Sequence, residues 1–234
     1  MFWRKHRPYA HFLHIGKTGG TAVSWAIKRG KPKSYRVVLH PHRVTLGDIP
    51  EGEAVFFFLR DPTSRFVSGF YSRMRQGRPR YFSAWSPEEA EAFARFKTPN
   101  ALAMALPSEP AQKAMRSIGH VRSSYWEWFD SEQYFRSRRA DILFVGFQER
   151  LDRDFERLKH TLGIAPHVSL PASDRDAHRS PSDVDRHMSD QAIRALREWY
   201  SRDYRLIEIC TRLASLHSPT SRPPPIISQR SMVE

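Results

Sequence analysis

Four short apolar runs are spaced along the chain, separated by more polar segments. They cover residues 10–15, 35–40, 54–60 and 140–147. The third run, AVFFFLR, is apolar at successive positions rather than at alternate ones. A strand that is buried on both faces has this pattern, and such strands are typical of parallel sheets. We therefore predict four core strands in a central, mainly parallel sheet.

Helical segments follow three of these four runs. Residues 21–29 come after a glycine-containing turn, and residues 61–75 begin with Asp-Pro, a typical N-cap and first-turn pair. Residues 148–163 are amphipathic and stop at a glycine. This alternation of strands and helices predicts a three-layer α/β domain.

Residues 76–139 form a long insertion between the third and fourth predicted strands. It contains predicted helical stretches at 87–105 and 110–118 and the aromatic sequence YWEWF at 125–129. Two interpretations are open, because aromatic side chains dominate the area of most cores. The insertion is either a lid that faces a substrate or a helical subdomain that packs its own aromatic residues.

The end of the chain changes in composition. A loop at 164–188 is followed by a last predicted helix at about 189–215. Residues 218–234 are rich in proline and serine, which is typical of a disordered tail. We predict a single domain over residues 1–217.

The charge balance narrows the possible partners. The chain has 38 Lys plus Arg against 25 Asp plus Glu, a formal net charge of +13. This excess predicts attraction to nucleic acid, an anionic membrane, or anionic small molecules and glycans. The basic residues are spread over the whole chain rather than gathered in a nucleic-acid-binding motif, so we expect no nucleic-acid partner.

The cysteine count, the apolar runs and the spacing of possible metal ligands predict the cellular compartment and the absence of a metal site. The single cysteine, Cys210, cannot form an internal disulfide, which favours a reducing compartment. No apolar run approaches the roughly 20 residues needed to span a bilayer, and residues 1–16 lack the apolar region of a signal peptide. We expect a soluble, cytoplasmic protein. No group of His, Cys and Asp has convincing metal-ligand spacing.

The turn after the first predicted strand suits a phosphate. Residues 16–18, Gly-Lys-Thr, match the end of a Walker A loop, but His11 stands where that loop needs its first glycine. The glycines at 19 and 20 let the backbone approach an anion beside Lys17 and a helix start. This fits a 5′-phosphate or phosphosulfate group. The competing interpretation is a glycine turn with a surface lysine.

A second anion site is predicted after the third strand. Arg60 ends that strand, and the following helix can bring the hydroxyl of Ser68 back toward it. Ligands of α/β sheets bind at the carboxyl ends of strands, and an arginine beside a hydroxyl recognises a terminal phosphate. Alternatively, Arg60 pairs with a nearby carboxylate. Asp61 would be the candidate metal ligand of an ATP-dependent small-molecule kinase, which is the alternative enzyme hypothesis.

These two motifs resemble those of a known family. HIGKTGGT at 14–21 resembles the 5′-phosphosulfate-binding loop of sulfotransferases, and RDPTSRFVSGFY at 60–71 resembles their 3′-phosphate-binding strand and helix. Their order and separation are similar to those of Golgi-type carbohydrate sulfotransferases, including the heparan sulfate 2-O-sulfotransferase group, and of their bacterial relatives. Residues 142–158 resemble a later strand and helix of the family. Gly16 departs from the pattern, because the family usually has proline there.

The resemblance implies a P-loop-like fold and a specific reaction. A sulfuryl group would move from 3′-phosphoadenylyl sulfate (PAPS) to a hydroxyl of a carbohydrate or glycoconjugate acceptor, without a metal, leaving adenosine 3′,5′-bisphosphate (PAP). It assigns Lys17 to the 5′-phosphosulfate and to the charge of the leaving phosphate. Arg60 and Ser68 would hold the 3′-phosphate. Further backbone and hydroxyl donors would come from Thr18, Gly19, Gly20 and Thr21.

Two histidines are candidates for the catalytic base. His40 and His42 follow the second predicted strand, where residues two apart point to the same side, although Pro41 can bend the chain. An imidazole suits this task, since its ordinary pKa is near 6.5. The sequence HPH resembles the His-x-His pair that includes the base in the 2-O-sulfotransferase group. We predict His42 as the base and His40 as its partner or alternate; a solvated strand end is the competing interpretation.

Other histidines are weaker candidates. His14 belongs to the phosphosulfate loop motif and could only shape it. His120, and His178 with Arg179 in the loop before the last helix, could close over donor or acceptor. For each of these we favour a structural role.

Overall fold

The computed structural model describes residues 7–79, 81–173 and 184–216 of the 234-residue chain. The predicted tail at 218–234, together with His178 and Arg179, lies outside the described residues. None of the described helices is long and apolar enough to cross a membrane.

Four parallel strands form the central sheet, in the order β2-β1-β3-β4. Their bounds are β1 Tyr9–Leu13, β2 Arg36–Leu39, β3 Ala54–Leu59 and β4 Ile142–Phe147. β1 pairs on both sides, with Phe12 opposite Leu39 of β2 and Phe56 of β3. β3 is buried from Val55 to Leu59, which explains its unbroken apolar run. The predicted α/β fold with four core strands is confirmed.

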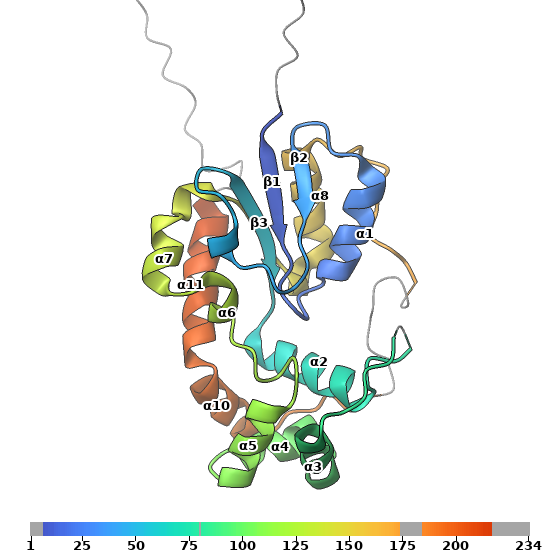
Figure 1. Cartoon of the computed structure of the whole chain (residues 1–234), viewed down its shortest axis with the longest axis vertical. Helices are drawn as coiled ribbons and strands as arrows, with labels where there is room; N and C mark the ends of the chain where they lie inside the picture. The colour runs from blue at the N-terminus through green and yellow to red at the C-terminus, as the bar shows by residue number, and fades with distance from the viewer. Residues whose placement is uncertain (1–6, 80, 174–183, 217–234) are drawn as a thin grey trace, which may run out of the picture.

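Helices cover both faces of the sheet and complete three layers (Figure 1). On one face, α1 (Gly20–Gly30) and α8 (Leu151–Leu162) pack around Phe12, Phe56 and Phe58. On the other face, α6 (Trp126–Phe129), α7 (Glu132–Ser137) and α11 (Ser201–Leu216) pack around Leu13 and Phe57. Successive residues of β3 therefore serve opposite layers, as strand geometry requires. Short 3₁₀ helices occur at Leu46–Asp48, Arg139–Asp141 and Gln148–Arg150.

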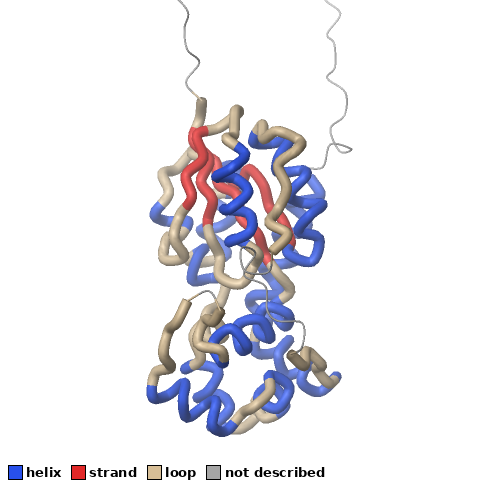
Figure 2. Tube along the Cα trace, turned by 90° about the vertical axis from the view of Figure 1, so that its right-hand side faces the viewer, coloured by secondary structure: helices blue, strands red, loops and turns tan. Residues whose placement is uncertain are grey.

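A second helical group lies beyond the carboxyl end of the sheet (Figures 1 and 2). It has its own apolar cluster. Its helices are α2 (Pro62–Met74), α3 (Pro87–Arg95), α4 (Pro99–Met104), α5 (Glu109–Ser117) and α10 (Asp190–Trp199).

Two predicted helices are each divided in two. The stretch at 87–105 breaks because Thr98 caps α4, accepting a hydrogen bond from the Ala101 amide, and Pro99 cannot continue a preceding helix. The final helix divides at Tyr200 into α10 and α11. The side chain of Tyr200 is buried in the second apolar cluster.

The insertion at 76–139 is shared between the two cores. Helices α3 to α5 belong to the second cluster, whereas the aromatic residues at 125–129 belong to the core of the sheet. Tyr125 is fully buried, and the rings of Phe129 and Phe57 have centroids 4.8 Å apart. The aromatic sequence is therefore neither a lid nor the core of a separate subdomain, because it packs directly on β3.

The strand order fixes where a ligand can bind. The chain moves from β1 to β2 in one direction and from β3 to β4 in the other, so the connections diverge between β1 and β3. In open α/β sheets, ligands bind at this switch point, beside the carboxyl ends of the strands. The turn after β1 and the arginine after β3 both lie there.

Candidate active site

A cleft of about 1190 Å³ lies at the switch point. Of the predicted site residues, Thr18 and His40 do not line it. His14 and His120 do line it, as do basic residues that the sequence analysis did not single out. The predicted site residues that line the cleft are Lys17, Gly19, Gly20, Thr21, His42, Arg60 and Ser68.

The turn between β1 and α1 presents free backbone amides. The backbone is left-handed at Lys17 (φ 69°) and at Gly19 (φ 85°), which caps α1 without a side-chain hydrogen bond. The amides of Ala22 and Val23 donate to the Gly19 carbonyl. Those of residues 17–21 donate no hydrogen bond within the described part of the chain. Consecutive free amides at a helix start form a nest that binds anions.

Two residues of the turn have structural tasks. The hydroxyl of Thr18 donates to the Ile15 carbonyl at 3.0 Å, and the side chain is buried, so this hydroxyl holds the turn and does not face the cleft. At Gly20, an added Cβ would lie 2.3 Å from Cδ2 of His14. Glycine is therefore needed at position 20, because the imidazole of His14 packs directly against it.

Lys17 lies in a cationic environment. Burial, followed by the positive charges of Arg60, Arg75 and Arg65, lowers its pKa from 10.5 to about 8. Its ammonium forms no ion pair with any described residue. A bound anion would offset both the desolvation cost of the ammonium and the repulsion from the arginines. This indicates that this part of the cleft suits a negatively charged ligand.

Arg60 lines the cleft and has one buried, unsatisfied donor. Its Nε is buried without a hydrogen-bond partner in the described residues. Burial lowers the pKa of Arg60, while the nearby carboxylate of Glu149 raises it. That carboxylate accepts a hydrogen bond from the Asp61 amide at 2.8 Å and forms no ion pair with Arg60 in the described chain. The alternative that Arg60 serves a structural ion pair is therefore not supported.

The backbone of Arg60 is fixed by Tyr125. The phenolic oxygen of Tyr125 accepts from the Arg60 amide at 3.1 Å and donates to the Arg60 carbonyl at 2.6 Å. Both backbone hydrogen-bonding groups of Arg60 thus depend on a single hydroxyl from the insertion. Because the backbone of Arg60 is fixed in this way, its side chain is directed toward the cleft.

The first prediction concerns this hydroxyl. Tyr125→Phe should lower the free energy of unfolding by about 1–3 kcal/mol, because two buried backbone groups lose their partner. Denaturant titration measures this loss. Tyr35→Phe is the matched control, since the half-buried Tyr35 hydroxyl has no hydrogen bond in the described residues. Equal stability of the two variants would contradict the proposed support of Arg60.

Arg65 links three parts of the site. Its Nε donates to the Gly16 carbonyl at 3.0 Å, and its Nη1 donates to the Ser123 carbonyl at 2.6 Å. The guanidinium also lies 4.6 Å from the centroid of the Tyr125 ring. Sequence reasoning missed this residue, although it stands inside the motif at 60–71. Its buried position ties the phosphate turn, α2 and the insertion together.

Further arginines line the cleft and were not predicted. Arg150 ends the 3₁₀ helix that precedes α8, Arg153 comes from the first turn of α8, and Arg186 comes from the segment before α10. The first two belong to the stretch at 142–158 that carried part of the family resemblance. Together with Lys17 and Arg60 they give the cleft its positive charge.

His42 is held with one nitrogen available. Its Nδ1 lies 2.8 Å from the His14 carbonyl, and its own carbonyl accepts from Nε1 of Trp128 at 2.8 Å. A carbonyl oxygen only accepts, so Nδ1 carries the hydrogen and Nε2 keeps its lone pair. The structure thus provides a proton acceptor at the cleft, on an exposed side chain.

His40 takes part in a different contact. Its Nε2 lies 2.8 Å from Nδ1 of His11, whose Nε2 lies 2.5 Å from a carboxylate oxygen of Glu53. The two rings stack with centroids 5.1 Å apart. β2 ends at Leu39, so both HPH histidines lie beyond the strand and the rule for residues two apart does not apply. The two imidazoles consequently do not form one pair in the cleft.

No group of three or more His, Cys, Asp or Glu in the described residues is placed to hold a metal ion.

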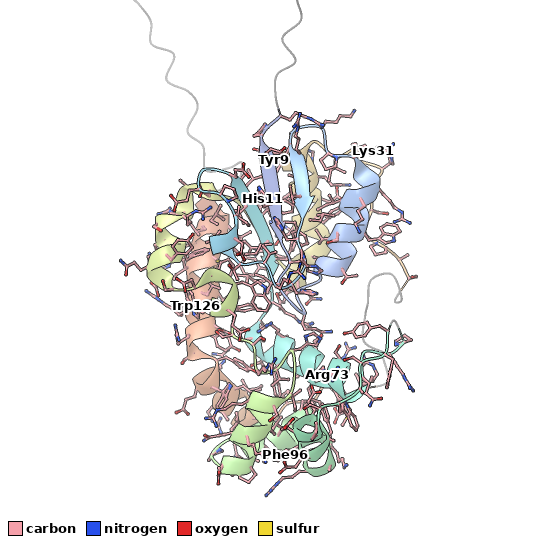
Figure 3. The ribbon with its side chains drawn as sticks, viewed as in Figure 1. Tyr9, His11, Lys31, Arg73, Phe96 and Trp126 are labelled. Atoms are coloured by element: carbon pink, nitrogen blue, oxygen red, sulfur yellow. The ribbon has the colours of Figure 1, made fainter. Side chains whose placement is uncertain are left out.

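The stick view in Figure 3 shows His11 on β1 and Arg73 in the second helical group. His11 thus belongs to β1, whereas Arg73 belongs to α2, beyond the carboxyl end of the sheet.

Comparison with known proteins adds one finding. The family model described as "Sulfotransferase family" matches residues 49–208, which is more than half of the chain. The matched residues include Arg60, Ser68 and His120 but not the phosphate turn or His42. No match was found among curated proteins.

Proposed function

Because the chain belongs to the sulfotransferase family, we propose that it transfers a sulfuryl group from PAPS to a hydroxyl of a carbohydrate or glycoconjugate. One observation carries this proposal. Two candidate anion-binding groups line one cleft, with Lys17 and the free amides after β1, and with Arg60 and Ser68 after β3. This arrangement suits a nucleotide with phosphate groups at both its 5′ and 3′ positions.

Each end of PAPS has a matching set of donors. The amides of residues 17–21 and the Lys17 ammonium would hold the 5′-phosphosulfate, and the guanidinium of Arg60 with the Ser68 hydroxyl would hold the 3′-phosphate. The cleft volume of about 1190 Å³ exceeds the usual range of roughly 300–1,000 Å³ for small-molecule sites. This leaves space for an acceptor beside the donor.

The transfer needs a base and a stabilised leaving group. Nε2 of His42 would take the proton of the acceptor hydroxyl as its oxygen forms a bond to sulfur. The bond between sulfur and the bridging phosphate oxygen breaks, and PAP leaves with the added negative charge. Lys17 and the free amides would stabilise that charge where it develops.

The contacts of Asp61 argue against the kinase alternative. One of its carboxylate oxygens accepts from the Ser64 amide at 2.8 Å and caps α2, and the other accepts from the Tyr204 hydroxyl at 3.0 Å. The carboxylate is thus committed to structural hydrogen bonds. This supports a donor that does not rely on Asp61 as a metal ligand.

Nucleotide selectivity tests the proposal. PAP should bind more tightly than AMP by about 10- to 100-fold, because one charge-assisted contact to the 3′-phosphate is worth about 1.5–3 kcal/mol. Arg60→Ala should remove this difference and leave the AMP affinity within about twofold. Isothermal titration calorimetry measures all four affinities.

A product assay completes the test. Labelled PAPS and a panel of saccharides should yield a sulfated saccharide by mass spectrometry. Binding of ATP with Mg²⁺ in preference to PAP would overturn the proposal in favour of a kinase.

A further inference from the structure

His120 reaches the cleft from the insertion. His120 lines the same cleft as Lys17 and Ser68, and its imidazole makes no hydrogen bond within the described residues. It is not among the buried atoms that lack a partner, so its ring nitrogens stay accessible from the cleft. The hydrogen-bonding capacity of this imidazole is therefore available to a ligand.

The backbone on both sides of His120 is anchored. The amide of Gly119 donates to Glu89 Oε1 at 2.9 Å, and the Val121 carbonyl accepts from the Tyr200 hydroxyl at 2.7 Å. Glu89 is in turn paired with Arg73, whose Nε donates to it at 2.7 Å. Residues from α2, α3 and the junction of α10 with α11 thus hold the backbone on each side of His120.

The conformation of His120 itself is unusual. Its backbone is left-handed, with φ 54°, a region that few residues other than glycine occupy, although histidine, asparagine and aspartate are enriched there. An added Cβ at Gly69, next to Ser68, would lie 3.2 Å from both the Cβ and the carbonyl oxygen of His120. The glycine therefore permits the close approach of this histidine to α2. Strained residues that the surrounding structure holds in place cluster at functional sites.

The charges around His120 keep its imidazole neutral. Burial, followed by the positive charges of Lys17, His42, Arg73 and Arg65, lowers its pKa from 6.5 to about 3. The nearby carboxylate of Glu89 is already paired with Arg73. A neutral imidazole carries one N–H donor, and a group with so low a pKa is a weak base. Donation to an anion is the task that suits it.

We propose that His120 is a second histidine of the reaction centre, which donates a hydrogen bond to the sulfuryl group of the donor beside Lys17. This inference rests on the proposed function. It divides the work between two imidazoles, since His42 accepts the proton of the acceptor and His120 holds the group that is transferred. Besides supporting Arg60 and His42, the insertion would then bring the His120 side chain to the sulfuryl group.

Comparing PAPS with PAP tests this contact without any acceptor, because PAP lacks the sulfuryl group. In calorimetric titrations, His120→Ala should weaken PAPS binding by about 10-fold and change PAP binding by less than about twofold. His120→Asn should retain most of the PAPS affinity, since its amide also donates and asparagine tolerates the left-handed backbone. The control is His160→Ala, which removes an exposed histidine from α8.

The outcomes separate the two proposals. If the unmodified protein binds neither PAPS nor PAP, the proposed function fails. If it binds both, and His120→Ala weakens them equally or not at all, the function stands and the sulfuryl contact is wrong. Equal loss of PAPS affinity in His120→Ala and His120→Asn, with PAP affinity kept, would also contradict donation and indicate another role for the imidazole.

Discussion

Replacing His42 by alanine is expected to lower the rate of sulfuryl transfer by about 10²- to 10⁴-fold, the usual contribution of a general base. The affinity for PAP should stay within about twofold, because the proposed role of the imidazole is toward the acceptor hydroxyl rather than the phosphates. Rapid-quench measurement of PAP release, with the acceptor found by the product screen, gives the rate. Calorimetry gives the affinity.

His40→Ala is the matched control for this variant. His40 bonds to His11 and does not line the cleft, so its loss should reduce the transfer rate by less than about 10-fold. It should instead lower the free energy of unfolding, because the His11 imidazole loses a partner. A rate collapse in His40→Ala with a normal rate in His42→Ala would exchange the roles of the two histidines.

Replacing Lys17 by alanine should lower the transfer rate by about 10²- to 10³-fold, the cost of removing one preorganised stabiliser of developing charge. The unmodified protein should also show a pH dependence that comes from this lysine. Its pKa of about 8 lies below its ordinary value, and a bound phosphate favours the charged form. PAP affinity should therefore be constant below that pKa and fall as the pH rises through about 8.

Lys17→Arg isolates the cause of this pH dependence. Arginine stays charged over the whole range, so the decline in PAP affinity above about pH 8 should disappear even if the absolute affinity changes. Lys113→Ala, which removes an exposed lysine paired with Glu91, should leave the decline intact. Titrations at several pH values between 7 and 10 read out the slopes, and an unchanged slope in Lys17→Arg would assign the titration to another group.

The sheet was accessible to sequence reasoning because its signals are local. A strand buried on both faces, such as β3, carries an unbroken apolar run that no loop or surface strand shows. Lys17 and Arg60 were within reach for a related reason, since Arg60 directly follows β3 and Lys17 lies in the turn after β1. Parallel strands end at the same edge, which brings both residues to one cleft without knowledge of any side-chain contact.

Other parts of the site depend on contacts between distant segments. Tyr125 meets the backbone of Arg60, and Arg65 meets Gly16 and Ser123, through hydrogen bonds that span between 49 and 65 residues. Nothing in the local pattern predicts these pairings. That His40 and His42 have different partners was missed for another reason. Their directions depend on β2 ending at Leu39, and sequence patterns do not fix the end of a strand to one residue.

The division of the insertion between two cores limits how it can be exchanged with that of a relative. A chimaera that swaps residues 76–118 would replace α3 to α5 and leave the aromatic residues under β3 in place. One that swaps the whole of residues 76–139 would also remove Tyr125 and Trp128, and with them the supports of Arg60 and of the His42 backbone. Grafts intended to change acceptor preference should therefore end before the aromatic sequence begins, and they should keep the anchors of His120.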